Sequence, residues 1–101
     1  MKEIISTEKA PAAIGPYSQA VKAGNLLFIS GQIPVDPATG EVVEATIQAQ
    51  TAQSLTNLKA ILAHAGGTMG HVVKTTVFLS DMENFVEMNR VYKTFFEAEC
   101  P

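Results

Sequence analysis

The sequence predicts an α+β fold in which two helices cover one face of a mixed β-sheet. Three observations support this prediction. Short apolar runs joined by turn residues fill the N-terminal third, a stripe at helical spacing occupies the middle, and an alternating strand precedes a second helical stripe. The expected order is β-β-β-α-β-α. At 101 residues the chain fits a single domain.

The N-terminal third predicts three strands, over Glu3–Ser6, Ser18–Ala23 and Leu26–Ser30. The last two are joined by Gly24-Asn25, a two-residue connection typical of hairpins because glycine and asparagine tolerate positive φ. The stretch between the first two strands, rich in Pro, Ala and Gly, predicts an ordered loop or arm. Pro34–Gly40 contains two prolines and a final glycine, which predicts a turn.

A helix is expected from about Thr46, because apolar and small residues recur on one stripe. Gly66-Gly67 supplies its stop signal. Polar residues, Asn57 among them, are expected on its other faces. The stripe consists of Thr51, Leu55, Leu58, Leu62 and Ala65.

Val72–Leu79 alternates β-branched and other residues and is the clearest predicted strand. Ser80-Asp81-Met82-Glu83 has the spacing of a capping box and predicts the start of a second helix. The inward face of this helix is expected to carry Met82, Phe85, Asn89, Tyr92 and Phe96.

Composition excludes several classes of function. Seven Lys and Arg against ten Asp and Glu give a net charge of −3, which argues against nucleic-acid binding because that needs a basic face. No apolar run is long enough to span a membrane. The single cysteine suits a reducing compartment, and the N-terminus lacks the apolar core of a secretory signal, so a cytoplasmic protein is expected. No phosphate loop, dinucleotide fingerprint or metal-ligand spacing is present, so no cofactor or metal is expected.

Four residues are candidates for a small-ligand site. Tyr17 follows Gly15-Pro16 and is either an aromatic plug with its hydroxyl at the surface or a phenol at a site. Ser30-Gly31 ends a strand, where glycine lets a ligand approach a free backbone N–H, although such a strand end is also common. Asn89, expected on an inward helix face, either satisfies a backbone group or lines a ligand pocket.

The segments Ile14–Val21, Phe28–Pro34 and Val73–Leu79, together with Asn89, closely resemble the Rid family (reactive intermediate/imine deaminase, also called YjgF). The resemblance extends from about Ile4 to Pro101. It implies a chorismate-mutase-like fold that forms homotrimers with sites at subunit interfaces. It also implies a cofactor-free 2-iminobutanoate/2-iminopropanoate deaminase, which hydrolyses enamine and imine intermediates to 2-oxo acids and ammonia.

The resemblance assigns roles to the four candidate residues. Tyr17 and Asn89 correspond to catalytic positions, whereas Ser30 and Gly31 correspond to substrate-binding positions. Lys74, in the middle of the predicted strand, is expected to be structural, and His64 and His71 are expected at the surface.

The chain departs from the family pattern at its C-terminus. Family members continue beyond the position of Pro101 into two strands that carry a carboxylate-binding arginine and a water-positioning glutamate. The only arginine here, Arg90, should point away from Asn89 because neighbouring helix residues lie about 100° apart. Residues 1–101 are therefore expected to be one C-terminally incomplete domain, a fragment rather than a natural short form, and a poor deaminase alone.

Two other functions compete with the deaminase. One is a regulatory protein of the same fold that binds small carboxylates without turnover. The other is RNA cleavage, which the acidic balance disfavours.

Overall fold

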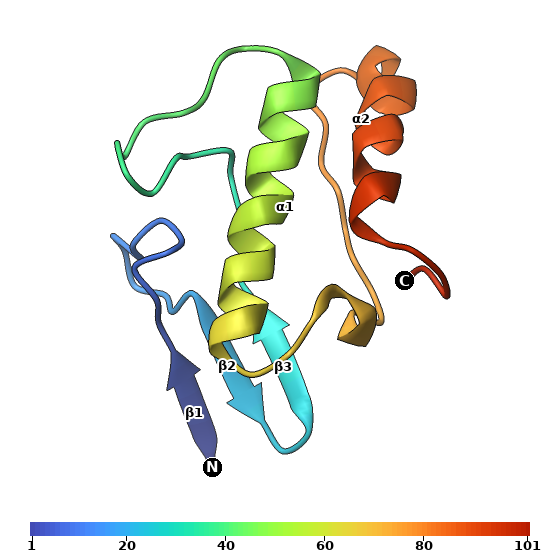
Figure 1. The fold of residues 1–101 in the computed structure, drawn as a ribbon. Coiled ribbons are helices and arrows are strands. Elements are labelled where there is room, and N and C mark those ends of the chain that lie inside the picture. The colour runs from blue at the N-terminus through green and yellow to red at the C-terminus, as the bar shows by residue number, and fades with distance from the viewer.

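The chain starts with a three-stranded antiparallel sheet. The computed structural model describes all 101 residues. The strands β1 (Lys2–Ile5), β2 (Ala20–Ala23) and β3 (Leu26–Ile29) lie in the order β1-β2-β3 (Figure 1). With two helices beside this sheet, the predicted α+β class is confirmed, although the ladders that form are all antiparallel rather than mixed.

The β2–β3 hairpin turns at Gly24-Asn25, as predicted. Gly24 has a φ of +61°, whereas the φ of Asn25 is not positive. This pattern, with glycine at the first central position, is that of a type II′ turn, which matches the twist of paired strands. Only the glycine is therefore required by the turn.

Gly24→Ala is expected to lower the free energy of unfolding by about 1–2 kcal/mol, because a Cβ disfavours the left-handed region. A Cβ at this position would meet no atom within 4 Å, so the cost is purely conformational. Asn25→Ala is the matched control, with an expected change below about 0.5 kcal/mol. Urea denaturation of both variants measures the difference, and equal losses would contradict this explanation of the turn.

Helix α1 (Ile47–His64) begins and ends where the sequence predicts. The Thr46 side chain accepts a hydrogen bond from the Ala49 N–H and caps the N-terminus. At the other end the Gly67 N–H donates to Leu62 O and the Gly66 N–H to Ala63 O, with Gly66 at φ +89°. These two bonds form a Schellman motif, so the predicted stop at the glycine pair is confirmed.

The core lies between α1 and the sheet. It is built around four buried residues, with half-buried Leu27 and Ile29 of β3 packed against them. Only 11 of the 101 residues are buried, so this core is small and leaves many large apolar side chains exposed. The four are Ile5, Ala10, Ala20 and Ile61.

The predicted α1 stripe is confirmed but is wider than expected. Thr51, Leu55 and Leu62 are buried, and Leu58 and Ala65 are half-buried. Asn57 was expected on another face and is instead 0% exposed, as is Ile61 one turn later. The prediction for Asn57 was wrong because its amide has backbone acceptors, Ile33 O and Val35 O, that lie far away in the sequence.

The predicted strand Val72–Leu79 does not form a ladder. A three-residue 3₁₀ turn, η1 (Met69–His71), leads into it, and residues 73–80 then run extended with no backbone–backbone hydrogen bond. The side chains still alternate between two faces. Thr75 shares a hydrogen bond of 2.6 Å with the Tyr92 hydroxyl on one face, and Lys74 donates to the Thr76 hydroxyl on the other. The segment has strand-like alternation without a partner strand, and assignment as a strand requires pairing.

The second helical region consists of η2 (Met82–Asn84), α2 (Phe85–Tyr92) and η3 (Lys93–Phe95). Asp81, rather than Ser80, caps its start by accepting a hydrogen bond from the Glu83 N–H. Helix α2 packs alongside α1 (Figure 1).

The inward face of α2 differs from the prediction. Phe96 is buried and Tyr92 is half-buried, as predicted, whereas Met82, Phe85 and Asn89 are exposed. Met88 is the buried residue of α2 itself. The opening 3₁₀ turn, with about three residues per turn, changes the phase of the side chains relative to a continuous α-helix.

The face of the sheet turned away from α1 carries an apolar row across all three strands. Ile4, Val21 and Phe28 are directly paired in register, so they share one face. Ile4 and Phe28 are 52% and 60% exposed. We call Ile4, Val21 and Phe28 the outer apolar row.

Candidate functional site

Tyr17 lies in the loop before β2, at a sharp bend of the chain. Its N–H donates to Gly15 O at 2.8 Å, and the ring lies over Gly15, where an added Cβ would be 3.6 Å from the ring. The side chain is 51% exposed and its hydroxyl has no hydrogen bond within the chain. The hydroxyl is therefore available to a ligand.

Ser30 locks the end of β3 onto the loop that carries Tyr17. Its N–H donates to Gln19 O at 3.0 Å, and its Oγ donates to Ser18 O at 2.6 Å. The hydroxyl proton is thus occupied, and only the lone pairs of Oγ remain for another group. In this arrangement Ser30 positions the loop, and its Oγ can accept hydrogen bonds. The Ser30 hydroxyl could donate to a carboxylate only by breaking its bond to Ser18 O.

Gly31 follows at the open end of the strand. Its N–H makes no backbone hydrogen bond, and a Cβ placed on it would meet no atom within 4 Å. Its φ is not positive. Nothing inside this chain requires glycine here, so its free N–H and lack of bulk are features that an approaching ligand could use.

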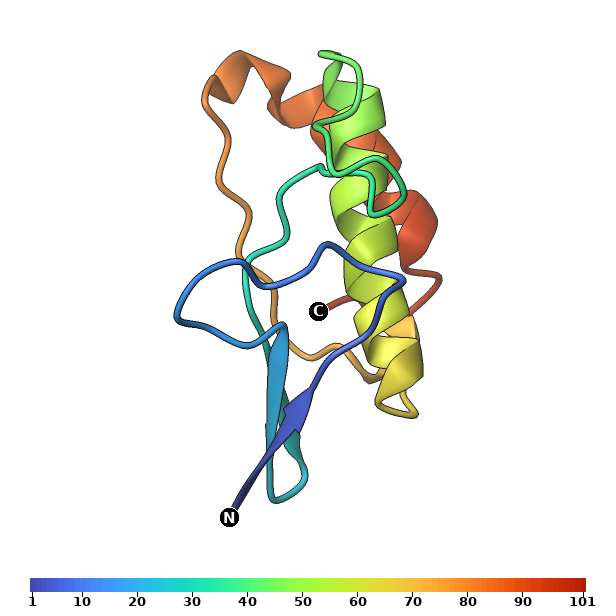
Figure 2. The ribbon, with the colours of Figure 1, turned by 90° about the vertical axis from the view of Figure 1, so that its left-hand side faces the viewer.

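Asn89 does not lie beside these residues. It is exposed on α2, and that helix packs alongside the N-terminal half of α1, whereas the hairpin lies by the C-terminal half (Figures 1 and 2). The fold therefore brings Tyr17, Ser30 and Gly31 together and leaves Asn89 on a separate element.

Arg90 is occupied by a neighbour on the same helix. Its guanidinium pairs with Glu87 at 3.1 Å, and the Glu87 carboxylate also accepts a hydrogen bond from Gln48 at 3.1 Å. The side chains of Arg90 and Glu87 are 67% and 40% exposed, so solvent screens the pair and it contributes little to stability. Arg90 lies on α2 with Asn89, away from the Tyr17–Ser30 region. It is therefore not placed to bind a substrate carboxylate in that region of the same chain.

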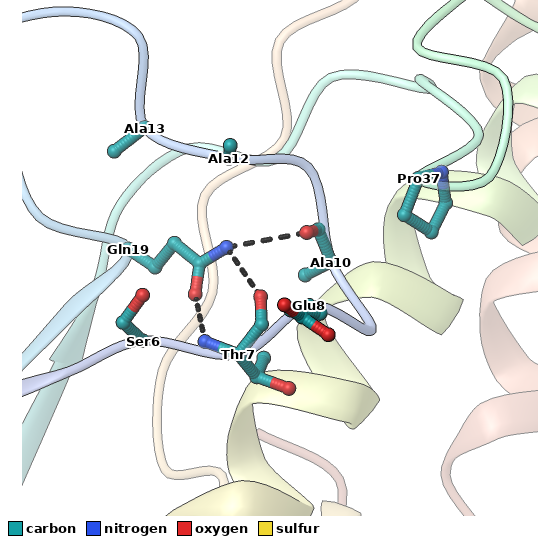
Figure 3. A pocket seen from close by; sticks show the side chains of 8 residues that line it. All are labelled: Ser6, Thr7, Glu8, Ala10, Ala12, Ala13, Gln19 and Pro37. Carbon is teal, nitrogen blue, oxygen red and sulfur yellow. Dashed lines mark hydrogen bonds between the residues drawn. The ribbon is translucent and has the colours of Figure 1, made fainter.

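A surface hollow lies elsewhere. It has a volume of about 470 Å³ and lies between the arm that follows β1 and Pro37 (Figure 3). Its only charged residue is Glu8, and its Gln19 amide is already fully bonded. With none of the candidate residues in its lining and an acidic group at its wall, it does not suit a small carboxylic acid. The lining residues are Ser6, Thr7, Glu8, Ala10, Ala12, Ala13, Gln19 and Pro37.

Sequence reasoning missed two buried amides that hold the loops of this site. Gln19, 3% exposed, donates to the carbonyls of Thr7 and Ala10 and accepts from the Thr7 N–H (Figure 3). It also donates to the Pro11 carbonyl. Asn57 donates to Ile33 O and Val35 O just beyond Gly31. The one available signal was the position of Asn57 one turn before Ile61, beside the apolar stripe of α1.

The remaining polar candidates are engaged locally. His71 Nδ1 accepts a hydrogen bond from the Thr68 N–H at 3.0 Å, and Lys74 is exposed. No three His, Cys, Asp or Glu side chains lie close enough to hold a metal ion. None of the helices combines the length and apolar character needed to cross a bilayer.

Comparison with known proteins gives concordant matches. The sequence profile described as "Endoribonuclease L-PSP" matches residues 7–101. A RutC family protein of Pyrococcus horikoshii is 57% identical over 101 residues, which are all of this chain and 80% of that protein. An Escherichia coli protein named 2-iminobutanoate/2-iminopropanoate deaminase is 54% identical over 96 residues, covering 95% of this chain and 74% of that one.

A solved structure agrees with these sequence matches. The crystal structure of E. coli TdcF with bound serine superposes with a TM-score of 0.90 at 50% identity, covering 94% of this chain and 74% of that chain. The profile spans nearly the whole sequence, and both relatives exceed half identity over nearly all of it. The chain therefore belongs to the Ribonuc_L-PSP family, which is the Rid (YjgF) family.

Proposed function

We propose that this protein is a 2-iminobutanoate/2-iminopropanoate deaminase. The observation that carries the proposal is the open end of β3. Ser30 fastens this end to the loop that carries Tyr17, and the next residue, Gly31, has an unbonded N–H. Relatives from E. coli and mouse, 54% and 48% identical, are named for this activity, which supports the assignment. TdcF, the relative with bound serine, supports a small amino-acid-like ligand.

The reaction adds water to the imine carbon, moves protons to the nitrogen and expels ammonia, leaving a 2-oxo acid. The Gly31 N–H would hold a substrate oxygen, and the free Tyr17 hydroxyl would hydrogen-bond the nitrogen or the attacking water. All these groups are neutral. They orient the substrate and polarise it, but they supply no full positive charge to its carboxylate.

Asn89 enters this proposal through a second copy of the chain. It is exposed on an element that does not pack on the Tyr17–Ser30 region, so it joins such a site only if α2 of another subunit lies there. A homotrimer with interfacial sites, as the Rid resemblance implies, provides that arrangement. The outer apolar row supports association, because two of its residues are more than half exposed. We also propose a cytoplasmic location, from the single cysteine.

A regulatory protein that binds small carboxylates without turnover is the second candidate. It is favoured by one observation, namely that the only arginine is paired with Glu87 on α2. The carboxylate-binding arginine and the water-positioning glutamate that the resemblance implies correspond to positions beyond Pro101.

A coupled assay separates the two candidates. A pyridoxal-dependent dehydratase generates 2-iminobutanoate in situ, and release of 2-oxobutanoate is followed with and without the protein. We expect acceleration above the spontaneous rate, and at least about a tenfold loss of that acceleration in Gly31→Ala, because the methyl blocks the approach to the N–H. Unfolding by urea should be unchanged in Gly31→Ala, since the position is open within the chain.

Tyr17→Phe is the second variant, and it removes only the free hydroxyl. L-Serine binding, measured calorimetrically, is the readout that does not depend on turnover. The regulatory candidate would be favoured by two results together. One is serine binding that is lost in Gly31→Ala, and the other is no acceleration by a protein of the relatives' full length. Full acceleration in both variants would contradict the proposed site.

A further inference from the structure

The Gly31 N–H and the Ser30 carbonyl are the two ends of one peptide unit. The chain contains no cis peptide bond, so this unit is planar and trans, and its N–H points opposite to its C=O. Whatever holds the Ser30 carbonyl therefore also fixes the direction of the Gly31 N–H. In the proposed site this N–H is the backbone donor to the substrate, so its direction affects how the substrate is bound.

The side chain of Gln32 holds that carbonyl. Its amide Nε2 donates to Ser30 O at 3.0 Å, and no backbone N–H donates to the same oxygen. Ser30 lies opposite Gln19 in the register of β2 and β3, and its N–H bonds Gln19 O, yet the Gln19 N–H does not donate in return. A regular antiparallel pair of this kind exchanges both bonds. The Gln32 amide thus takes the place of a missing bond of the ladder.

Burial around Gln32 reverses the usual preference. Gln32 is half-buried, whereas the next residue, Ile33, is 65% exposed. Apolar side chains are ordinarily the buried ones, and a polar side chain that leaves water needs a hydrogen-bond partner. The Ser30 carbonyl is the one hydrogen-bond partner of the Gln32 side chain within the protein. This single bond therefore accounts for the placement of Gln32.

The peptide between Ser30 and Gly31 has little else to fix its orientation. Before it, the Ser30 N–H fastens the chain to Gln19 O. After it, the Asn57 amide fastens the chain at Ile33 O. Between these two points, glycine permits a wide range of backbone dihedral angles, and the Gly31 N–H has no backbone partner. Rotation of this one peptide would present its carbonyl, an acceptor, where the site needs a donor.

We propose that Gln32 is a positioning residue of the site, whose amide holds the Ser30–Gly31 peptide so that the Gly31 N–H faces the bound substrate. Gln32 acts through Ser30 O and touches no substrate itself. A hydrogen bond to a carbonyl also polarises its peptide, which makes the N–H at the other end a stronger donor. The inference rests on the proposed function, to which it adds the residue that orients the backbone donor.

The direct test follows the Gly31 N–H in the absence of substrate, by ¹⁵N relaxation. Gln32→Met keeps a neutral, unbranched side chain of similar length but has no donor. We expect the order parameter of the Gly31 N–H to fall from about 0.85, typical of rigid backbone, to below about 0.6. Gln53→Met is the matched control, because Gln53 is also half-buried and also donates one hydrogen bond, to Asn57. It should leave the Gly31 order parameter unchanged.

A double-variant cycle connects this orientation to the function. Calorimetric L-serine binding and the coupled deaminase assay are measured for Gln32→Met, for Gly31→Ala and for the variant that carries both changes. Gln32→Met should lose about fivefold in serine affinity and in acceleration, which is the effect of one neutral hydrogen bond. Because Gln32 acts through the Gly31 N–H, the double variant should lose no more than Gly31→Ala alone. Urea unfolding should give similar losses of stability for Gln32→Met and Gln53→Met.

Two results would overturn the inference. One is an unchanged Gly31 order parameter in Gln32→Met. The other is a double variant whose loss is the product of the two single losses, because that result indicates a structural role independent of Gly31. Failure of the proposed function gives a different result: the unmodified protein neither binds serine nor accelerates the reaction, whereas the order parameter still reports whether Gln32 holds the peptide.

Discussion

Asn57→Asp is expected to lower the free energy of unfolding by about 3 kcal/mol or more. The aspartate has the shape of asparagine but cannot donate to Ile33 O and Val35 O, and its carboxylate would be charged at a position with 0% exposure. Each buried acceptor left without a donor costs about 1–3 kcal/mol, and burial of an unpaired charge costs more. Urea denaturation at neutral pH measures the loss.

Gln53→Glu provides the matched amide-to-acid control. Gln53 is half-buried and donates only to Asn57 Oδ1 at 2.8 Å, so its change should cost about 1 kcal/mol or less. Hydrogen exchange adds a local readout. Asn57→Asp should accelerate exchange in the 34–43 turn, which is closed by the Val43 N–H to Pro34 O bond. A loss for Asn57→Asp no larger than that for Gln53→Glu would show that Asn57 does not anchor this loop.

Gln19→Glu is expected to release the arm that follows β1 and to cost about 3 kcal/mol. The amide nitrogen donates to the carbonyls of Thr7, Ala10 and Pro11, and a carboxylate can donate to none of them. Only the bond from the Thr7 N–H would survive. The freed arm contains Lys9, so trypsin should cleave after it much faster than in the unmodified protein.

Gln32→Glu is the control for this experiment. Gln32 is half-buried, and its amide donates to a single carbonyl, that of Ser30. Its replacement should leave cleavage after Lys9 unchanged and cost about 1 kcal/mol. If Gln19→Glu leaves the cleavage rate unaltered, the arm is held by the burial of Ala10 rather than by the amide.

The elements that the sequence predicted well are those set by local interactions. The Gly24 turn, the Thr46 cap and the Gly66-Gly67 stop each depend on neighbours within about five residues, and all three are present in the structure. A strand in 72–79 was also suggested by local alternation. Whether it pairs depends on a distant partner, which no local pattern contains.

The candidate site was predictable only in part, for related reasons. Tyr17, Ser30 and Gly31 come together because the hairpin register fixes them. Asn89 was expected inward, but the buried residue of α2 is its neighbour Met88, in a helix that begins from a 3₁₀ turn. The acceptors of Asn57 lie 22 and 24 residues away in the chain, so nothing near Asn57 announces its burial.

The outer apolar row also has a thermodynamic consequence. Any species that covers Ile4, Val21 and Phe28 in the folded state, but does not bind the unfolded chain, stabilises the fold by mass action. In the homotrimer proposed above, the small core would provide one part of the free energy of folding and the neighbouring subunits the other. The stability of this protein would then be a function of concentration, and a melting temperature would describe it only together with the concentration at which it was measured.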